Sequence, residues 1–591
     1  MNRRQFARRS AGLAALLAAS GRGFAQDPLA RGAEAEDPFA PGADPFSPEP
    51  VTGAIVLPAS PAAAFRRPDV KPFPADDPDE DDPAGDEPVA TLPPDDLPSG
   101  GRAPFGWPAF AAYPAGPRVP GWGTTTLRFP PLPEGRRTTD VAAVRFALAM
   151  GAPAAGAVGV HSPVTGSLRG AVDVRFAPPL QLFSVPLSSV GGEAALREGL
   201  ALRVVGGPET LWVLGAEYDS VEIEAAVEEA DAGALHVPLE LRPHLLVLGA
   251  DDAWTEFFRR LDSLATLQPF GWREGAVLDG LLDLAALPER AALRETARRH
   301  LALFLTGGPG TAAVPPPGPL APPGATLADA PDAAPFAALA RLAPDHPLLD
   351  ALRQRWLAGP PVGPTPPAGP VPPGAAETSA AAGLLAVAYP MAALGRARGN
   401  EELTAAALRA LRSRLADPEG GDEDDPAPLR VRRRMLRLLG AARTLAAVGE
   451  REDAADLVAA FRRLADAALN RFMSEEPFSA EPADGSKPAP GPGLTNAVGV
   501  AAAWAIGVKA GWLGEEHAAA ADAVREALTD RLTPDGFLFE SPPPGGPGGV
   551  ALDTTAMGLA AQLIAARETT PAAAPAPVPL TEPAPAPLPL D

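Results

Sequence analysis

The chain has 591 residues, and its 50 Lys and Arg against 73 Asp and Glu give a formal net charge of −23. Such a surface repels phosphate backbones, so we expect no nucleic-acid partner. The absence of cysteine excludes disulfides, thiolate metal sites and cysteine nucleophiles.

Residues 1–25 are typical of an export signal. Arg3 and Arg4 are followed by Phe6, then by a short apolar run at 11–19 and by small residues before Gln26. This order favours a twin-arginine signal cleaved before Gln26, although an ordinary secretory signal remains open. We therefore expect an exported protein of the periplasm or cell envelope. No later apolar run is long enough to predict a membrane span.

Residues 26–100 are predicted to be an acidic, disordered linker. They hold 17 acidic residues against four basic ones, together with 17 prolines. A segment of this composition buries too little apolar surface to offset the entropy of its chain. The Pro-rich residues 569–591 predict a second disordered segment, a tail.

Residues 101–250 are predicted to form an antiparallel β-sandwich domain. Short runs rich in Val, Leu and Phe alternate here with Gly and Pro turns. We expect a hairpin over 202–214, around Gly206-Gly207-Pro208. The expected strands are 124–129, 141–149, 157–161, 172–176, 202–205, 211–214, 221–226 and 237–241.

Residues 251–568 change to the apolar period of helices. Twelve helices are expected: 252–267, 273–286, 289–306, 334–342, 346–358, 376–395, 400–416, 428–448, 451–473, 494–512, 515–532 and 551–567. Connections after the even-numbered helices are short, whereas those after the odd-numbered ones are mostly long. Short connections join antiparallel neighbours, so six helical hairpins in an α/α six-hairpin barrel (toroid) are predicted, with the long loops on one rim. An open helical solenoid is the alternative.

The helical region also resembles glycoside hydrolase families 88 and 105, the unsaturated uronyl and rhamnogalacturonyl hydrolases. The segments that carry the resemblance are FGW at 270–272 with GAVLDGLL at 275–282, FAALARL at 336–342, VAYPMA at 387–392, the helix 499–513 with LTPDGF at 532–537, and AMGLA at 556–560. The resemblance implies the same barrel. It also implies hydrolysis of the unsaturated uronide ends that polysaccharide lyases leave, by hydration of an enol ether with an Asp as general acid and base.

The resemblance also indicates where the catalytic residues would lie. The family's catalytic Asp stands seven residues before the proline at 390, where this chain has Gly383. Asp332 matches a second family acid with a shift of one residue, and Glu377 is the nearest carboxylate to Gly383. We therefore expect Asp332 and Glu377 as proton-transfer groups and Arg432, retained from a family segment, on the substrate carboxylate.

Side-chain chemistry alone adds few candidates. Trp272 and Tyr389 could supply aromatic walls to a sugar site. Asp279 and Asp283 lie four residues apart on one helix face, either as a carboxylate pair in the lumen or as a packing contact. No pair of histidines has metal-ligand spacing, so neither a metal nor another cofactor is expected.

Two classes of function therefore remain open. The first is an exported hydrolase of lyase-derived oligosaccharides with an eroded active site. The second is a non-catalytic protein of the envelope, on the same fold, that binds glycan or protein. The glycine at 383 favours the second class, whereas the family resemblance favours the first.

Overall fold

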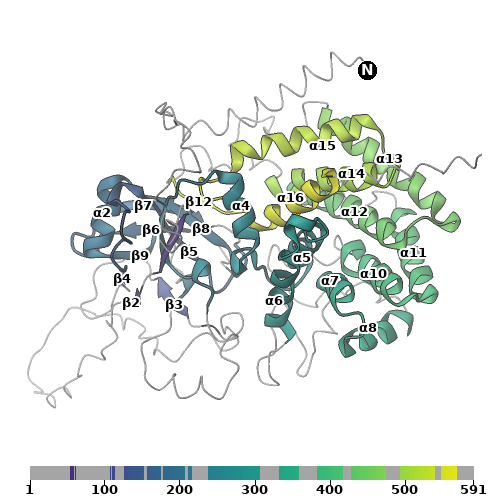
Figure 1. Ribbon diagram of the computed structural model, residues 1–591, viewed down its shortest axis with the longest axis horizontal. Helices are drawn as coiled ribbons and strands as arrows, with labels where there is room; N and C mark the ends of the chain where they lie inside the picture. The colour runs from purple at the N-terminus through teal and green to yellow at the C-terminus, as the bar shows by residue number, and fades with distance from the viewer. Residues whose placement is uncertain are drawn as a thin grey trace, which may run out of the picture.

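The computed structural model describes residues 54–58, 60–61, 107, 109–112, 126–151, 156–174, 177–205, 211–215, 237–305, 332–358, 383–416, 427–473, 493–539 and 548–568. A sheet domain lies beside a helical domain (Figure 1). The predicted signal, tail and strand at 221–226, most of the predicted linker, and Glu377 lie outside the described residues. Within the described ranges, no helix has the length and apolar character that crossing a membrane requires.

The sheet domain contains two five-stranded antiparallel sheets and a two-stranded one, in the orders β1-β11-β5-β8-β12, β2-β4-β9-β6-β7 and β10-β3. Apolar side chains of both large sheets share one buried core. The strands are β1 (Ile55–Pro58), β2 (Ser60–Pro61), β3 (Ala109–Ala112), β4 (Thr126–Arg128), β5 (Val141–Ala147), β6 (Gly156–His161), β7 (Leu168–Val174), β8 (Leu182–Pro186), β9 (Leu200–Val205), β10 (Leu211–Leu214), β11 (His244–Val247) and β12 (Val550–Ala551).

Several details of the predicted sheet domain are wrong. β1 lies within the range predicted to be a linker, because the apolar run Ile55-Val56-Leu57 pairs with β11. The predicted hairpin at 202–214 does not form, since β9 pairs with β4 and β6 whereas β10 pairs with β3.

Two further strands were misassigned. The strand predicted at 237–241 is a 3-10 turn (Leu239–Leu241) that follows Pro238, and the strand β11 begins only at His244. β8 was missed, as was helix α2 (Ser189–Glu198), whose N-cap Ser188 accepts a hydrogen bond from the backbone of Gly191. The local sequence pattern did not predict these elements correctly. The start and end of a strand depend on the partner strand with which it pairs, and that partner is distant in the sequence.

Each of the twelve predicted helices corresponds to one observed helix, although the one predicted at 252–267 ends at Leu261, and residues 376–382 of the one predicted at 376–395 lie outside the described residues. Their bounds are α4 (Ala253–Leu261), α5 (Trp272–Leu284), α6 (Leu293–Leu305), α7 (Pro335–Leu342), α8 (Pro347–Ala358), α10 (Tyr389–Arg398), α11 (Glu401–Ala416), α12 (Ala427–Val448), α13 (Ala455–Met473), α14 (Leu494–Lys509), α15 (Glu515–Ala527) and α16 (Thr554–Arg567). The π-helical turn η8 (Leu384–Ala388) leads directly into α10.

Six of these helices form a cycle of contacts. In the order α5, α7, α10, α12, α14 and α16, each packs against the next, and α16 packs against α5. Hydrogen bonds join the starts of neighbouring helices of the cycle: Asp332 joins α5 to α7, Ala333 binds Ala386 just before α10, and Thr495 of α14 binds Asp553 just before α16. We call this end of the cycle the rim.

Glycines allow the cycle to close. A Cβ on Gly280 of α5 would lie 2.2 Å from the carbonyl oxygen of Gly558 in α16, and a Cβ on Gly558 would lie 2.5 Å from the Cα of Val277. The two helices therefore touch backbone to backbone. Any larger side chain at either position has to push them apart.

The two domains are joined by a buried ion pair. Arg145 of β5 donates two hydrogen bonds to the carboxylate of Asp535, from the connection between α15 and α16, and one of these measures 2.7 Å. Phe537 covers the pair, with its ring centroid 4.7 Å from the Cζ of Arg145. Strand β12 follows and pairs with β8. The connection between α15 and α16 thus contributes a strand and an ion pair to the sheet domain.

We expect Asp535→Asn to lower the free energy of unfolding by about 3–5 kcal/mol, because it leaves the Arg145 guanidinium buried without a carboxylate. Urea unfolding measures this loss. Asp456→Asn, which removes an exposed partner of Arg412, is the matched control and should have little effect. A loss below about 1 kcal/mol for Asp535→Asn would contradict the structural role of the pair.

Gly558→Ala should destabilise the chain by about 1–3 kcal/mol, because the added methyl group separates α16 from α5. Gly514→Ala is the control, since a Cβ at this residue meets nothing within 4 Å. Thermal unfolding of the two variants tests the close helix contact. Equal melting temperatures would show that it is not a constraint.

Candidate functional site

Asp332 lies at the rim, where it connects the starts of two helices of the cycle. Its Oδ2 accepts a hydrogen bond of 2.6 Å from the backbone N–H of Trp272, the first residue of α5. Its Oδ1 accepts one of 3.2 Å from the N–H of Ala334, just before α7. Gly271, with φ of 143°, brings the backbone close to the carboxylate, and a Cβ there would lie 3.1 Å from Oδ2. One side chain therefore satisfies orphan donors of two helices.

The carboxyl group of Asp332 holds its proton more strongly than an ordinary aspartic acid. Burial raises its pKa to about 6, although the two backbone hydrogen bonds act in the opposite direction. A group that titrates near neutral pH can both donate and accept a proton there. Of the two carboxyl groups proposed from the sequence for proton transfer, only Asp332 lies within the described residues, and its pKa is close to neutral pH.

A second polar group lies where α5 and α16 begin. Glu274 accepts hydrogen bonds from the backbone N–H of Gln268, at 2.8 Å, and from Nδ1 of His300, at 2.9 Å. The Gln268 amide donates to Thr554 and accepts from Thr555, both in the first turn of α16. Sequence reasoning missed this group because its members are distant in the chain. The members of this group form hydrogen bonds with one another, so the group joins the start of α5 to the start of α16.

Gly383 lies beside the start of α7. It precedes the π-helical turn η8, and the N–H of Ala333 donates a 3.2 Å hydrogen bond to the carbonyl of Ala386 within that turn. A Cβ at 383 would meet the guanidinium group of Arg414, with Cζ, Nε and Nη2 each at 3.5 Å. The position that the resemblance gives to a catalytic Asp thus faces a cation here.

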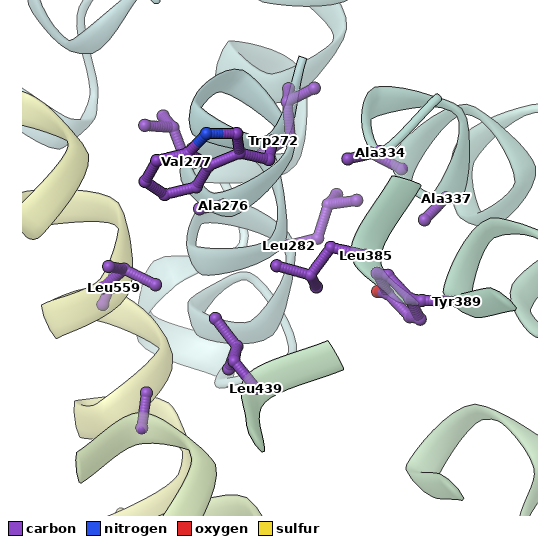
Figure 2. Close-up of a cluster of buried hydrophobic side chains, with 14 of the residues drawn as sticks. Trp272, Ala276, Val277, Leu282, Ala334, Ala337, Leu385, Tyr389, Leu439 and Leu559 are labelled. Atoms are coloured by element: carbon purple, nitrogen blue, oxygen red, sulfur yellow. The ribbon is translucent and has the colours of Figure 1, made fainter. Parts of the chain in front are cut away.

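Buried apolar side chains lie between the helices of the cycle. Figure 2 shows Leu385 of η8, Leu439 of α12 and Leu559 of α16, together with Trp272 of α5, and all four are buried. Trp272 was expected to bind substrate, and its indole belongs to this packed core. This part of the interior is therefore lined by apolar side chains.

Tyr389 belongs to a polar network deeper in the cycle. Its hydroxyl donates a 2.6 Å hydrogen bond to Asp279, seven residues after Trp272 and thus about 10 Å below the rim. Arg341 of α7 joins Asp279 and Asp283 at 3.0 and 2.8 Å. Arg443 of α12 binds Asp283 at 2.5 Å. The spacing of the two aspartates left open a carboxylate pair or a rim or packing contact, and the structure pairs them with two guanidinium groups.

This network is held together by opposite charges. Although burial alone would raise it, the two guanidinium groups lower the pKa of Asp283. Burial, together with the neighbouring Asp283, raises the pKa of Asp279, and burial likewise raises that of the Tyr389 phenol. Two carboxylates and two arginines balance in charge, and Gln562 of α16 closes the network by accepting from Arg443 at 3.1 Å. Its saturated hydrogen bonds give it a structural role.

The other predicted residues lie apart from Asp332 or outside the description. Arg432 lies near the start of α12, where its side chain is partly exposed and has an interaction partner. Glu377 falls outside the described residues. In the part of the chain that the structure describes, no group of three or more His, Asp or Glu side chains could hold a metal ion.

Comparisons with known proteins give structural neighbours only. No protein-family model matches the sequence, and no curated protein sequence matches it. The fold is similar to a solved polysaccharide lyase, with 17% identity and a TM-score of 0.36 over 51% of this chain and 90% of the other.

Two further solved structures belong to the families that the sequence resembles. One is a glycosyl hydrolase family 88 protein from Bacteroides vulgatus, with 14% identity and a TM-score of 0.36 over 53% of this chain and 97% of the other. Another is a possible member of glycoside hydrolase family 105 from Salmonella enterica, with 13% identity and a TM-score of 0.38 over 53% and 91%. Because these scores are low, the activity has to be argued from the residues of this chain.

The raised pKa of Asp332 predicts a pH-dependent stability. A folded pKa of about 6 against an ordinary value near 3.9 means that the folded state binds the proton more tightly. The contribution is therefore fully present below about pH 4 and is lost as the pH rises through 6. The unfolding free energy of the wild type, relative to that of Asp332→Asn, should therefore fall by about 1–3 kcal/mol as the pH rises from about 4 to above 6.

Urea unfolding at several pH values between 4 and 8 measures this difference. Asp345→Asn, which removes an exposed carboxyl beyond the opposite end of α7, is the matched control. A wild-type curve parallel to that of Asp332→Asn at every pH would contradict the raised pKa.

Proposed function

We propose that the chain is an exported glycoside hydrolase-like protein, built on an α/α six-hairpin barrel, that hydrolyses unsaturated uronide ends of oligosaccharides with Asp332 as its proton-transfer group. The observation that carries this proposal is the Asp332 carboxyl, fixed at the rim between α5 and α7 with a pKa of about 6. The closed cycle of six helices supports the barrel. The order of the resembling segments supports the family of reactions.

The chemistry requires only one carboxyl group. In the hydration of an enol ether, a proton adds to one carbon of the double bond and water adds to the other. The carboxylate that gave the first proton can take the second from the attacking water, so the group ends as it began. A pKa near 6 leaves both protonation states accessible at neutral pH. The loss of a carboxyl at Gly383 therefore leaves a chemically sufficient group at the rim.

Export is part of the proposal. The paired Arg3 and Arg4, followed by Phe6, support transport of a folded protein through the twin-arginine route. A chain without cysteine gains nothing from oxidative folding outside the cytoplasm, which fits this route. The proposed location, periplasm or cell envelope, is where fragments of extracellular polysaccharides would be met.

A non-catalytic glycan- or protein-binding role is the second candidate. It is favoured by the buried leucines between the helices, which line the described interior with apolar groups in place of the polar ones that a sugar site needs. Gly383 favours it as well. A protein of this kind would bind glycan at the rim and release it unchanged.

Hydrolysis of unsaturated disaccharides, followed by the loss of their ultraviolet absorbance, tests the proposal. The wild-type chain should consume the substrate, and Asp332→Asn should lower kcat at least about 100-fold, because the amide cannot transfer the proton. Asp345→Asn should keep wild-type rates. Binding of the disaccharides without turnover by the wild type would establish the non-catalytic role instead.

A further inference from the structure

A proline interrupts the helical hydrogen bonds next to Asp332. The π-helical turn η8 leads without a break into α10, whose second residue is the buried Pro390. In an α-helix, the carbonyl of Ala386 would accept a hydrogen bond from the N–H of residue 390. Proline has no N–H, and its ring crowds the carbonyl four residues earlier. The helix widens at this point, where the N–H of Tyr389 donates to Leu384, five residues before it.

The carbonyl that Pro390 leaves without a helical donor has a partner in the neighbouring segment. Ala386 accepts a 3.2 Å hydrogen bond from the backbone N–H of Ala333. This N–H belongs to the peptide group that follows Asp332, so the hydrogen bond fixes the backbone that carries the Asp332 side chain. Because Ala333 is buried, its N–H would lose free energy without an acceptor.

Two glycines allow close packing on either partner of this hydrogen bond. A Cβ on Gly275 of α5 would lie 2.7 Å from the Cβ of Ala334, so α5 packs closely against the segment 332–334. A Cβ on Gly440 of α12 would lie 2.6 Å from the Cβ of Leu384, so α12 packs closely against η8. A shift of η8 therefore requires a shift of its neighbours as well.

The carboxyl group of Asp332 responds to its position. Among the described residues its hydrogen-bond partners are two backbone N–H groups, and no charged side chain pairs with it. Burial and these two hydrogen bonds set its pKa. Both depend on where the backbone at 332–333 lies, so a displacement of this backbone changes the proton affinity of the carboxyl group.

We propose that Pro390 is a positioning residue for Asp332. By withholding a helical donor from the carbonyl of Ala386, it keeps this oxygen for Ala333 and so fixes the peptide group next to the carboxylate. Gly440 assists, because it lets η8 lie against α12. The inference rests on the proposed function for the reaction that Asp332 serves, but the position of Asp332 can be measured without turnover.

Carbon-13 NMR of the aspartate carboxyl groups in the full chain tests this inference. The resonance of Asp332 is the one lost in Asp332→Asn, and its titration with pH gives the pKa. Pro390→Ala supplies the missing N–H, so the turn can close as an α-helix and draw Ala386 away from Ala333. The carboxyl group then becomes more hydrated. Its pKa should fall from about 6 towards the ordinary value of about 3.9, by at least about half a unit.

The stability of the same variant separates positioning from packing. Alanine suits the interior of a helix better than proline does. A purely structural role for Pro390 therefore predicts an unchanged pKa of Asp332, whatever the melting temperature. Pro347→Ala is the matched control, because this exposed proline begins α8, where an N–H would have no helical partner. It should leave the pKa of Asp332 as in the wild type.

Gly440→Ala is a second, independent variant. Its methyl group displaces η8 from α12, so the pKa of Asp332 should move in the same direction as in Pro390→Ala. Gly507→Ala is its control, since this glycine near the end of α14 is crowded equally closely, by the side chains of Leu513 and Phe461. If Pro390→Ala does not fold, Gly440→Ala decides by the same criterion.

The outcomes separate the inference from the proposed function. If the chain hydrolyses an unsaturated uronate disaccharide, Pro390→Ala should lower kcat about 10- to 100-fold with little change in KM, because the carboxyl group is displaced. A pKa that moves in Pro390→Ala and Gly440→Ala but not in the controls, without any turnover, would support the inference and contradict hydrolysis. Turnover with an unchanged pKa of Asp332 in folded Pro390→Ala would keep the hydrolase and overturn the inference. An equal shift in Gly507→Ala, or a wild-type pKa of about 3.9, would also overturn it.

Discussion

The rim depends on the carboxyl group of Asp332, which joins two helix starts and has a pKa raised by burial. Both of its oxygens accept backbone hydrogen bonds, one from the start of α5 and one from the start of α7. Partial burial, needed to reach both helices, is also what raises its pKa to about 6. The same constraint that fixes the two helix starts therefore creates a group able to transfer protons near neutral pH. If Asp332 acts as proposed, a change at this residue alters both stability and turnover.

The packing below the rim restricts where a ligand can act. Gly280 and Gly558 let α5 and α16 touch, and buried leucines lie between the helices of the cycle. About 10 Å below the rim, Asp279, Arg341 and their partners form a saturated network of opposite charges. The sheet domain is held to the last helical hairpin by Arg145 and Asp535. The described fold thus presents a hydrogen-bonded rim above an interior lined by apolar side chains and one ion-pair network.

The sequence predicted the helices far better than the site. Helical periodicity and loop lengths are local, so all twelve helices were found, whereas β8 and β11 depended on pairing partners distant in the chain. Asp332 was proposed because a resemblance pointed to it, and its catalytic role stays a prediction. The pairing of Tyr389 with Asp279, and the contact of Arg414 with Gly383, arise only when separate helices meet. Neither contact has a signature in the order of residues.

The pH dependence of turnover tests the central role of Asp332 most directly. If the protonated carboxyl starts the reaction, kcat for an unsaturated uronate disaccharide should fall about tenfold for each pH unit well above an apparent pKa near 6. The measurement is a series of initial rates from pH 4 to 9. A rate that stays constant through pH 6, with the protein folded throughout, would contradict proton transfer by Asp332.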